Sequence, residues 1–273
     1  MRTAAGTAAV RVDGGTAVEI GGVNDVGELL ADPAWRERAR AASGREHVLA
    51  SLSYAPLVPR PDKIICVGLN YRSHMQEMRQ EPPRFPTLFA KFRSSLVGAH
   101  DDIVLPEVAS QVDWEAELAV VVGSSARHVD DDGARAAIAG YSVLNDVSVR
   151  DWQHRTVQWL QGKTFEHSTP LGPWLVTSDE FDGRAAEITC EVNGETMQKG
   201  DISDLVFGPT ALVAYISDVI TLLPGDVIAT GTPGGVGVAR NPQRFLQDGE
   251  VVTTRIAGIG ELRNECRREA RSS

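Results

Sequence analysis

The stretch that decides the fold runs from Asp113 to Gly123 and reads DWEAELAVVVG. Its apolar second half and alternating first half are typical of a β-strand inside a sheet. Glu115 and Glu117 are two residues apart, so a strand directs both carboxylates to the same face. Two such charges repel each other and lose hydration, and a hard divalent cation is the simplest group that offsets both effects. The pattern alone also fits two glutamates that face solvent on an edge strand.

The composition is that of an ordinary globular protein, with 273 residues of which 42% are hydrophobic and 23% are charged. The formal net charge of -10 argues against non-specific binding to nucleic acid or to anionic membranes. The apolar runs have strand length and the N-terminus has no apolar signal segment, so we expect no membrane span and no secretion. Three widely separated cysteines make neither a disulfide framework nor a zinc motif, and the reducing cytoplasm is the expected compartment.

Residues 1–58 are expected to form a small N-terminal α/β module. Residues 8–20 have the pattern of a hairpin that turns at residues 13–15, and residues 25–43 have the pattern of one or two short helices broken near Pro33. Prolines between residues 54 and 61 predict an extended linker. The main domain is therefore expected to span residues 59–273.

Strands dominate after residue 60. Helices are expected at 132–139, 147–159 and 209–219. Strands are expected at 63–68, 87–92, 103–106, 113–123, 141–146, 174–177, 187–192, 227–230 and 251–256. The strand at 251–256 is expected to be the last, and the charged tail after Glu265 is expected to fray. Because few helices separate the strands, the pattern favours an α+β, β-rich fold over a doubly wound sheet.

Two glycine-containing motifs suggest nucleotide binding, and neither meets the requirements of its class. The sequence GKT at 162–164 lacks the first glycine of a P-loop, because Val157 stands there. The glycines of 231–237 follow a strand but do not spell G-x-G-x-x-G. This second segment is interpreted either as a tight turn or as backbone amides that face a ligand carboxylate.

A third acidic residue, Asp146, ends an apolar strand 29 residues after Glu117. It is either a helix cap or a third carboxylate of a metal site. Three carboxylates without a nearby histidine or cysteine favour Mg²⁺, Mn²⁺ or Ca²⁺ over Zn²⁺. Arg150 and Gln153 follow at helical spacing, where they either grip a substrate carboxylate or face solvent.

Further candidates for acid–base and charge chemistry stand on both sides of this region. In a short helix capped by Ser73, His74 and Glu77 lie on one face and form either an acid–base dyad or an ordinary surface pair. Lys91 and Lys163 have apolar or small neighbours, from which a lysine either reaches solvent or points into a polar pocket.

Taken in order, six blocks of this sequence resemble the fumarylacetoacetate hydrolase family. They are GLNYRSHMQE at 68–77, FAK at 89–91, EAELAVVVG at 115–123, NDVSVRDWQ at 145–153, KTF at 163–165 and TGTPGGVG at 230–237. Six blocks in the right order are far more specific than any one of them. The resemblance implies a rolled, mixed β-sandwich, usually a homodimer, and activity on small 2-oxo and 2,4-dioxo acids.

The resemblance also implies roles for single residues. It implies a site for Mg²⁺ or Mn²⁺ made by Glu115, Glu117 and Asp146. His74 and Glu77 match a dyad that activates water on a lid over the substrate, and Lys163 matches a lysine that stabilises developing negative charge. The positions that match substrate contacts are Arg150, Gln153, Thr232 and Lys91.

The sequence departs from fumarylacetoacetase itself in two ways. It lacks a further aspartate between Val67 and Tyr71, and its N-terminal part is shorter, so it is more similar to smaller acylpyruvase-type or catechol-pathway members. Phe92-Arg93 follows Lys91 where many members have Pro-Ser. This difference weakens the substrate role of Lys91 and assigns recognition of a distal acid group to Arg93.

The function predicted first is hydrolysis of a C–C bond in a 2,4-dioxo acid, such as an acylpyruvate or fumarylpyruvate, through an enolate that Mg²⁺ stabilises. His74 and Glu77 would activate water, and Lys163 would stabilise the oxyanion. The same enolate arises from decarboxylation of oxaloacetate or isomerisation of a 2-oxo diacid related to 2-hydroxymuconate, so decarboxylase and isomerase are the alternatives. A non-catalytic ligand-binding protein is less favoured, because the expected carboxylates, dyad and lysine are all present.

Overall fold

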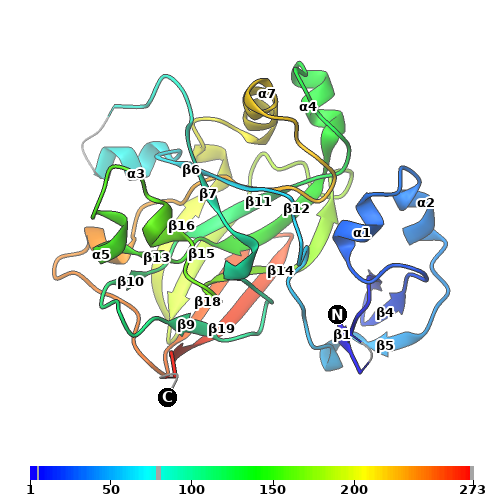
Figure 1. Ribbon diagram of the computed structural model, residues 1–273, viewed down its shortest axis with the longest axis horizontal. Helices are drawn as coiled ribbons and strands as arrows, with labels where there is room; N and C mark the ends of the chain where they lie inside the picture. Colours follow the sequence, from blue (N-terminus) through cyan, green and yellow to red (C-terminus); the bar gives the residue numbers. More distant parts are fainter. Residues whose placement is uncertain (5, 78–80, 271–273) are drawn as a thin grey trace.

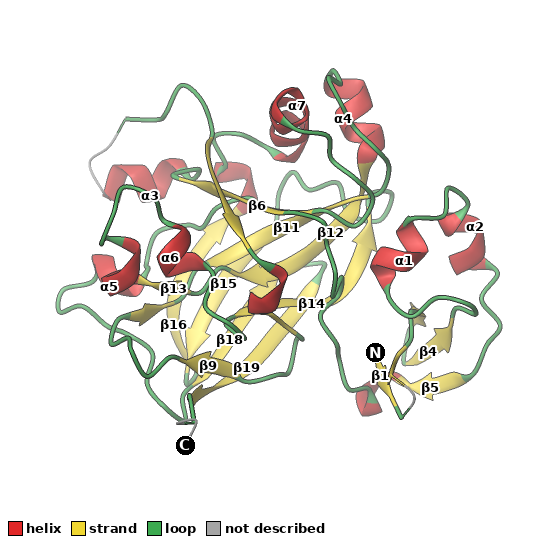
Figure 2. Ribbon diagram, in the orientation of Figure 1, coloured by secondary structure: helices red, strands yellow, loops and turns green. Residues whose placement is uncertain are grey.

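The computed structural model describes residues 1–4, 6–77 and 81–270, and it is rich in strands (Figure 1). Two sheets form the body of the protein, and helices lie around their edges (Figure 2). The expected α+β, β-rich fold class is confirmed. No helix in the described ranges is long and apolar enough to cross a membrane.

The larger sheet has seven strands in the spatial order β7-β6-β17-β11-β12-β14-β8. In this order the strands span Thr87–Lys91, Ile64–Gly68, Val227–Ala229, Ala116–Val122, Ile138–Asn145, Thr169–Thr177 and Leu96–Val97. β11 is antiparallel to both its neighbours, β17 and β12, and all its residues are buried. This central place explains why the stretch is apolar without interruption after its first residues.

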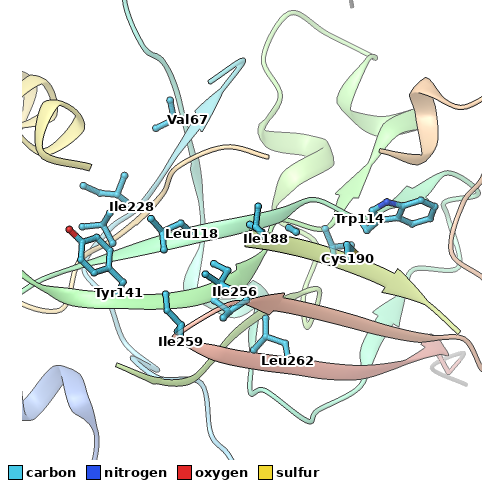
Figure 3. Close-up of a cluster of buried hydrophobic side chains, with 14 of the residues drawn as sticks. Val67, Trp114, Leu118, Tyr141, Ile188, Cys190, Ile228, Ile256, Ile259 and Leu262 are labelled. Atoms are coloured by element: carbon cyan, nitrogen blue, oxygen red, sulfur yellow. The ribbon is translucent and has the colours of Figure 1, made fainter. Parts of the chain in front are cut away.

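The second sheet has five strands in the order β16-β15-β18-β19-β9. They span Glu195–Asp201, Glu187–Val192, Val251–Ile256, Gly260–Arg268 and Ile103–Leu105. Asn193 and Gly194 both have positive φ in the hairpin between β15 and β16, as the sequence predicts. Apolar side chains of the two sheets, among them Leu118 and Ile256, share one buried cluster (Figure 3).

The N-terminal residues form small sheets and two short helices of their own. β1 (Arg2–Thr3) pairs with β2 (Gly6–Thr7), and β3 (Val10–Asp13), β4 (Thr16–Glu19) and β5 (Glu46–Val48) form a three-stranded sheet. The helices α1 (Val26–Leu30) and α2 (Trp35–Arg40) flank Pro33, as expected. Their apolar side chains join a second cluster with Val121 and Leu144 of the large sheet. The boundary at residue 58 stays a prediction.

The remaining elements connect or cover the sheets. They are α3 (Arg72–Glu77), α4 (Asp131–Ala137), α5 (Arg150–Gln153), α6 (Leu160–Lys163), α7 (Pro209–Val219) and the short pair β10 (Val112–Asp113) with β13 (Ser148–Val149). α7 begins at a proline, whose missing N–H costs nothing at this position. Short 3₁₀ turns occur at Leu49–Ser51, Arg93–Ser95, Ile202–Asp204 and Gly237–Ala239.

Three expectations about local structure are wrong. The range 147–159, expected to be one helix, instead contains the short strand β13 and a single helical turn, α5, and residues 154–159 are irregular. Ser73 does not cap α3, because the helix begins one residue earlier and the Ser73 N–H donates to the carboxylate of Asp204 at 2.9 Å. The chain forms a further strand after 251–256, since β19 continues through Arg268. Alternate residues of β19 face the core, a period that charged residues between them conceal in the sequence.

Candidate active site and metal centre

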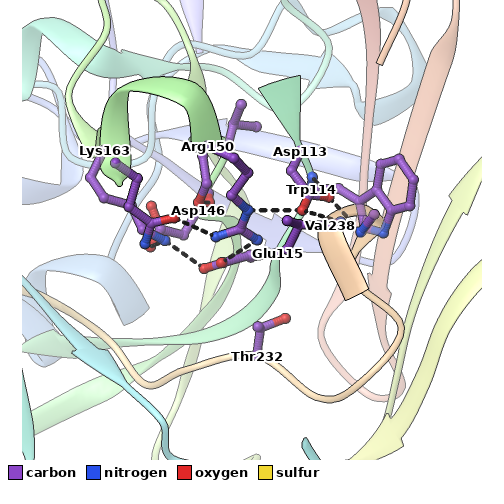
Figure 4. Close-up of polar contacts among 12 residues, drawn as sticks. Asp113, Trp114, Glu115, Asp146, Arg150, Lys163, Thr232 and Val238 are labelled. Atoms are coloured by element: carbon purple, nitrogen blue, oxygen red, sulfur yellow. Dashed lines mark hydrogen bonds and ion pairs between the residues drawn. The ribbon is translucent and has the colours of Figure 1, made fainter. Parts of the chain in front are cut away.

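The three carboxylates expected to bind a metal converge at one end of the β11–β12 pair, and Figure 4 shows two of them, Glu115 and Asp146. Glu115 directly precedes β11, Glu117 is its second residue, and Asp146 directly follows β12. The two strands are antiparallel with Ala116 opposite Asn145, so the start of one meets the end of the other. One oxygen from each carboxylate lies within 4.8 Å of the other two, and all three residues are buried.

Two buried lysines lie against this cluster. The Nζ of Lys163, at the end of α6, is 2.7 Å from Glu115 Oε2 and 2.8 Å from Asp146 Oδ2. The Nζ of Lys91, at the end of β7, is 2.7 Å from Asp146 Oδ1. Burial lowers the pKa of Lys163, but the charges of Asp146 and Glu115 outweigh burial and raise that pKa above its usual value. Lys163 therefore stays protonated at neutral pH.

Arg150 joins the cluster from the first position of α5. Its guanidinium donates to Asp113 Oδ2 at 2.8 Å and to Gln153 Oε1 at 2.9 Å, and it lies 2.7 Å from Glu115 Oε1. Arg150 and Gln153 were predicted to contact substrate. In the structure they bind each other, and Arg150 holds Glu115 from the side opposite to Lys163 (Figure 4).

Asp113 is a member of the cluster that the sequence analysis did not select. Its carboxylate is fully buried and accepts hydrogen bonds from the backbone N–H groups of Trp114, Gly237 and Val238 at 2.7–3.0 Å, as well as from Arg150. It therefore ties the glycine-rich turn to the arginine that holds Glu115. The sequence contains a signal for this residue, because Asp113, Glu115 and Glu117 are each two residues apart, the spacing that directs strand side chains to one face.

The glycine-rich turn supplies backbone donors to the protein's own carboxylates. The Gly231 N–H donates to Glu117 Oε2 at 2.7 Å, and the Gly237 N–H donates to Asp113 Oδ1 at the same distance. The alternative in which these amides face a ligand carboxylate is therefore wrong for these two glycines. At Gly237 a Cβ would lie 1.9 Å from the carbonyl oxygen of Arg244, so no other residue fits there without movement of the backbone.

The two glutamates of the central strand have opposite pKa shifts. Burial raises the pKa of Glu115, but Lys163 and Arg150 outweigh burial and lower that pKa to about 2. Burial raises the pKa of Glu117 well above its usual value, and the charges of Asp146 and Glu115 raise it further. No lysine or arginine in the described part of the chain forms an ion pair with Glu117.

This arrangement fits a divalent cation. In the described ranges the cluster holds four buried carboxylates and three cations, Lys91, Arg150 and Lys163, so one negative charge has no cationic partner when all four carboxylates are ionised. That charge falls on Glu117, next to oxygens of the other two candidate ligands. Carboxylate oxygens are the ligands that Mg²⁺ and Mn²⁺ prefer. Glu115, Glu117 and Asp146 are the residues that would hold the ion.

The remaining predicted site residues lie on short helices, a 3₁₀ turn and a loop. His74 is half-buried in α3, whereas the side chain of Glu77 lies outside what the structure describes, so the dyad stays a prediction. Arg93 is exposed at the start of a 3₁₀ turn. Thr232 is buried directly after Gly231, and its Oγ1 accepts a hydrogen bond from Gln198 at 2.8 Å. Gln198 was not selected from the sequence.

Residues 63–267 match the family model for the fumarylacetoacetate (FAA) hydrolase C-terminal domain. Over 219 residues the chain is 46% identical to the human oxaloacetate tautomerase FAHD2A, mitochondrial, which covers 79% of this chain and 70% of that protein. It is also similar to 5-carboxymethyl-2-hydroxymuconate delta-isomerase from Mycobacterium smegmatis, with 34% identity, a TM-score of 0.81 and coverage of 98% and 97% of the two chains. Fumarylpyruvate hydrolase from Pseudomonas aeruginosa, in complex with Mn²⁺ and pyruvate, has 31% identity, a TM-score of 0.69 and coverage of 77% and 91%.

Proposed function

The chain belongs to the fumarylacetoacetate hydrolase family, and from this premise we propose that it is a divalent-metal-dependent tautomerase that interconverts the enol and keto forms of a small 2-oxo dicarboxylic acid such as oxaloacetate. The observation that carries the proposal is the buried cluster of Glu115, Glu117 and Asp146, flanked by protonated side chains. Mg²⁺ and Mn²⁺ are the proposed ions.

A bound divalent cation would act as a Lewis acid toward the 2-keto and carboxylate oxygens of the substrate. The protein's own residues supply the rest. Lys163 stays protonated and can stabilise negative charge on the substrate oxygen as a proton leaves C3. Lys163 and Arg150 together keep Glu115 ionised, and Arg150 orients it through a 2.7 Å contact. His74, predicted with Glu77 to activate water, is proposed here as the base for the C3 proton. The proton lost from C3 is balanced by one gained at the C2 oxygen, so no water is consumed.

Tautomerisation is preferred to hydrolysis for two reasons. The relative named as an oxaloacetate tautomerase is 46% identical over most of this chain, whereas the fumarylpyruvate hydrolase is 31% identical. Tautomerisation also needs only proton transfers at C3 and the C2 oxygen, whereas hydrolysis requires an activated water in addition.

The decisive experiment follows the ultraviolet absorbance of enol-oxaloacetate in the presence of Mg²⁺ or Mn²⁺. We expect the protein to accelerate its decay at least about a hundredfold over the metal ion alone, because positioned acid–base groups contribute that much. Asp146→Asn should abolish the acceleration, and the exposed variant Glu261→Gln is the matched control. Full activity in excess chelator would contradict the proposal.

Hydrolysis of a 2,4-dioxo acid is the second candidate, because a structural neighbour that is a fumarylpyruvate hydrolase is matched over 91% of its length. Acylpyruvates that lose their enol absorbance and release pyruvate would favour it. Release of pyruvate from oxaloacetate would favour decarboxylation instead. If His74→Ala lost hydrolysis but kept tautomerisation, the two reactions would depend on different residues. The homodimer and the cytoplasmic location stay predictions.

A further inference from the structure

Gln198 of β16 lies between the central strand β11 and the loop after β17, and it hydrogen-bonds to both. Its Oε1 accepts the backbone N–H of Ala116 at 2.9 Å. Its Nε2 donates to Thr232 Oγ1 at 2.8 Å and to the carbonyl oxygen of Pro233 at 2.9 Å. The side chain is 1% exposed, so every polar atom of the amide is satisfied by protein.

The orientation of this amide is fixed by its partners. The Ala116 N–H can only donate, and the Pro233 carbonyl can only accept. A flipped amide would place its NH₂ against an N–H and its oxygen against a carbonyl oxygen, with two buried groups left unsatisfied. Both hydrogens of Gln198 Nε2 are therefore committed, one of them to Thr232.

This orientation determines what the Thr232 hydroxyl can do. Since Oγ1 accepts from Gln198, its own hydrogen points elsewhere, and no acceptor for it occurs among the hydrogen bonds of residues 1–4, 6–77 and 81–270. Thr232 directly follows Gly231, whose N–H is 2.7 Å from Glu117 Oε2. The free hydroxyl hydrogen is thus held beside the carboxylate cluster, on a residue that is 7% exposed.

We propose that Gln198 is a positioning residue that makes Thr232 a hydrogen-bond donor to an oxygen acceptor of the bound ligand, a carboxylate or keto oxygen. The inference deepens the proposed function, on which it rests for the class of ligand. The substrate role of Thr232 was predicted from the resemblance alone. The structure adds the direction of the hydrogen bond and a residue on the second sheet that imposes it.

The test uses a double-mutant cycle of Gln198→Glu, Thr232→Val and the double variant. The new carboxylate in Gln198→Glu keeps an acceptor for the Ala116 N–H but cannot donate, so the Thr232 hydroxyl turns its hydrogen toward it and away from the ligand. Gln198→Met, which removes both amide groups at similar volume, serves if the added charge prevents folding. The control is Glu195→Gln. Glu195 is exposed on the same strand, and the substitution exchanges the same two chemical groups, a carboxylate and an amide.

The ligand is oxalate, a non-reacting dicarboxylate, measured by calorimetry with Mn²⁺ present, and Mn²⁺ alone is titrated in parallel. We expect each single variant to raise the Kd of oxalate about tenfold, and the double variant to raise it no further, because one hydrogen bond to a charged group is lost once. The Kd of Mn²⁺ should not rise above that of the control, whereas Gln198→Glu should melt at a lower temperature because the buried Pro233 carbonyl loses its donor.

Additive losses, an unchanged Kd of oxalate in either single variant, or weaker binding of Mn²⁺ would each overturn the inference, because they indicate independent or merely structural roles. Failure of the unaltered protein to bind oxalate would overturn it as well. Absence of turnover on every 2-oxo acid, together with a non-additive cycle for oxalate, would contradict the proposed function and leave the role of Gln198 supported.

Discussion

Two regions of the molecule contain ion pairs of the same length, but the side chains of these pairs differ in their exposure to water. On the surface hairpin of β18 and β19, Arg255 and Glu261 approach to 2.7 Å with side chains 50% and 45% exposed. In the buried cluster Lys163 and Glu115 are also 2.7 Å apart, with side chains 2% and 11% exposed. Water competes with the first pair and is excluded from the second. Burial, and not distance, therefore decides what each pair does.

The buried cluster also differs in its balance of charge. The surface pair joins one cation to one anion, whereas the cluster places four carboxylates among three cations in the described part of the chain. A protein optimised for stability alone gains nothing from an unmatched buried charge. The imbalance at Glu117 is therefore the feature of this fold that most directly indicates a ligand.

The largest expected difference between the two regions follows from removal of one carboxylate. Glu115→Gln should reduce activity at least about a thousandfold and lower the free energy of unfolding by about 3–5 kcal/mol, because Lys163 and Arg150 lose a buried partner. Thermal unfolding and titration with Mn²⁺ are the measurements. A variant as stable and as active as the unaltered protein would show that burial has no such effect here.

A smaller effect is expected from Asp113→Asn, because Arg150 keeps its contact with Glu115. Activity should fall about tenfold to a hundredfold, and unfolding should become easier by about 1–3 kcal/mol, since a charged acceptor of Arg150 becomes neutral. Steady-state kinetics and thermal unfolding measure both quantities. If activity were unchanged while stability fell, Asp113 would support the fold without orienting the site.

The pH dependence of stability should separate the two glutamates in the metal-free protein. The folded pKa of Glu115 is about 2, below the usual 4.5, so its stabilisation is present above pH 4.5 and is lost as the pH falls through about 2. The folded pKa of Glu117 is raised, so its stabilisation is present below pH 4.5 and is lost as the pH rises through that raised pKa.

Mg²⁺ should therefore raise the melting temperature more at about pH 8 than at about pH 5.5. Each kcal/mol of added stabilisation corresponds to a rise of about 2–4 °C in the melting temperature. A thermal melt at both pH values, with and without Mg²⁺, measures this difference. Glu117→Gln should abolish it. An equal shift at both values would mean that Glu117 is not the group that exchanges a proton for the ion.

The smallest effect is expected at the surface pair. Arg255→Ala should change the free energy of unfolding by less than about 1 kcal/mol and leave the activity unchanged, because water already solvates both side chains. Chemical unfolding and the enol-oxaloacetate assay measure these quantities. A loss comparable to that of Asp113→Asn would remove the contrast between the two regions.

Much of the site could be predicted from sequence because its signals are local. Strand alternation brings Glu115 and Glu117 together, and Asp146 stands at a strand end that pairs with them. The lysines were selected, but not their partners, because Lys91 meets Asp146 across 55 residues and only the folded register defines that contact. Gln198 lies on a strand of the second sheet, so no local pattern connects it with Thr232.

The fold was predictable to a similar degree. The β-rich class follows from strand patterns, and the hairpin at residues 193–194 from its turn residues. The helix expected at 147–159 is reduced to the single turn α5, and we attribute this to the buried contacts of Arg150, which outweigh local propensity. β19 was missed because charges on its exposed face conceal the alternation.

The position of β17 has a consequence for how the protein folds. This strand pairs with β6 and β11, and the hydrogen bond from the Lys63 N–H to Asp226 beside it joins residues 163 positions apart. Closure of so long a loop is slow, and until it occurs Glu117 lacks its donor from Gly231. The charged side chains of the cluster are therefore expected to lose their hydration late in folding. A cation that recognises only the finished cluster should slow unfolding without accelerating folding.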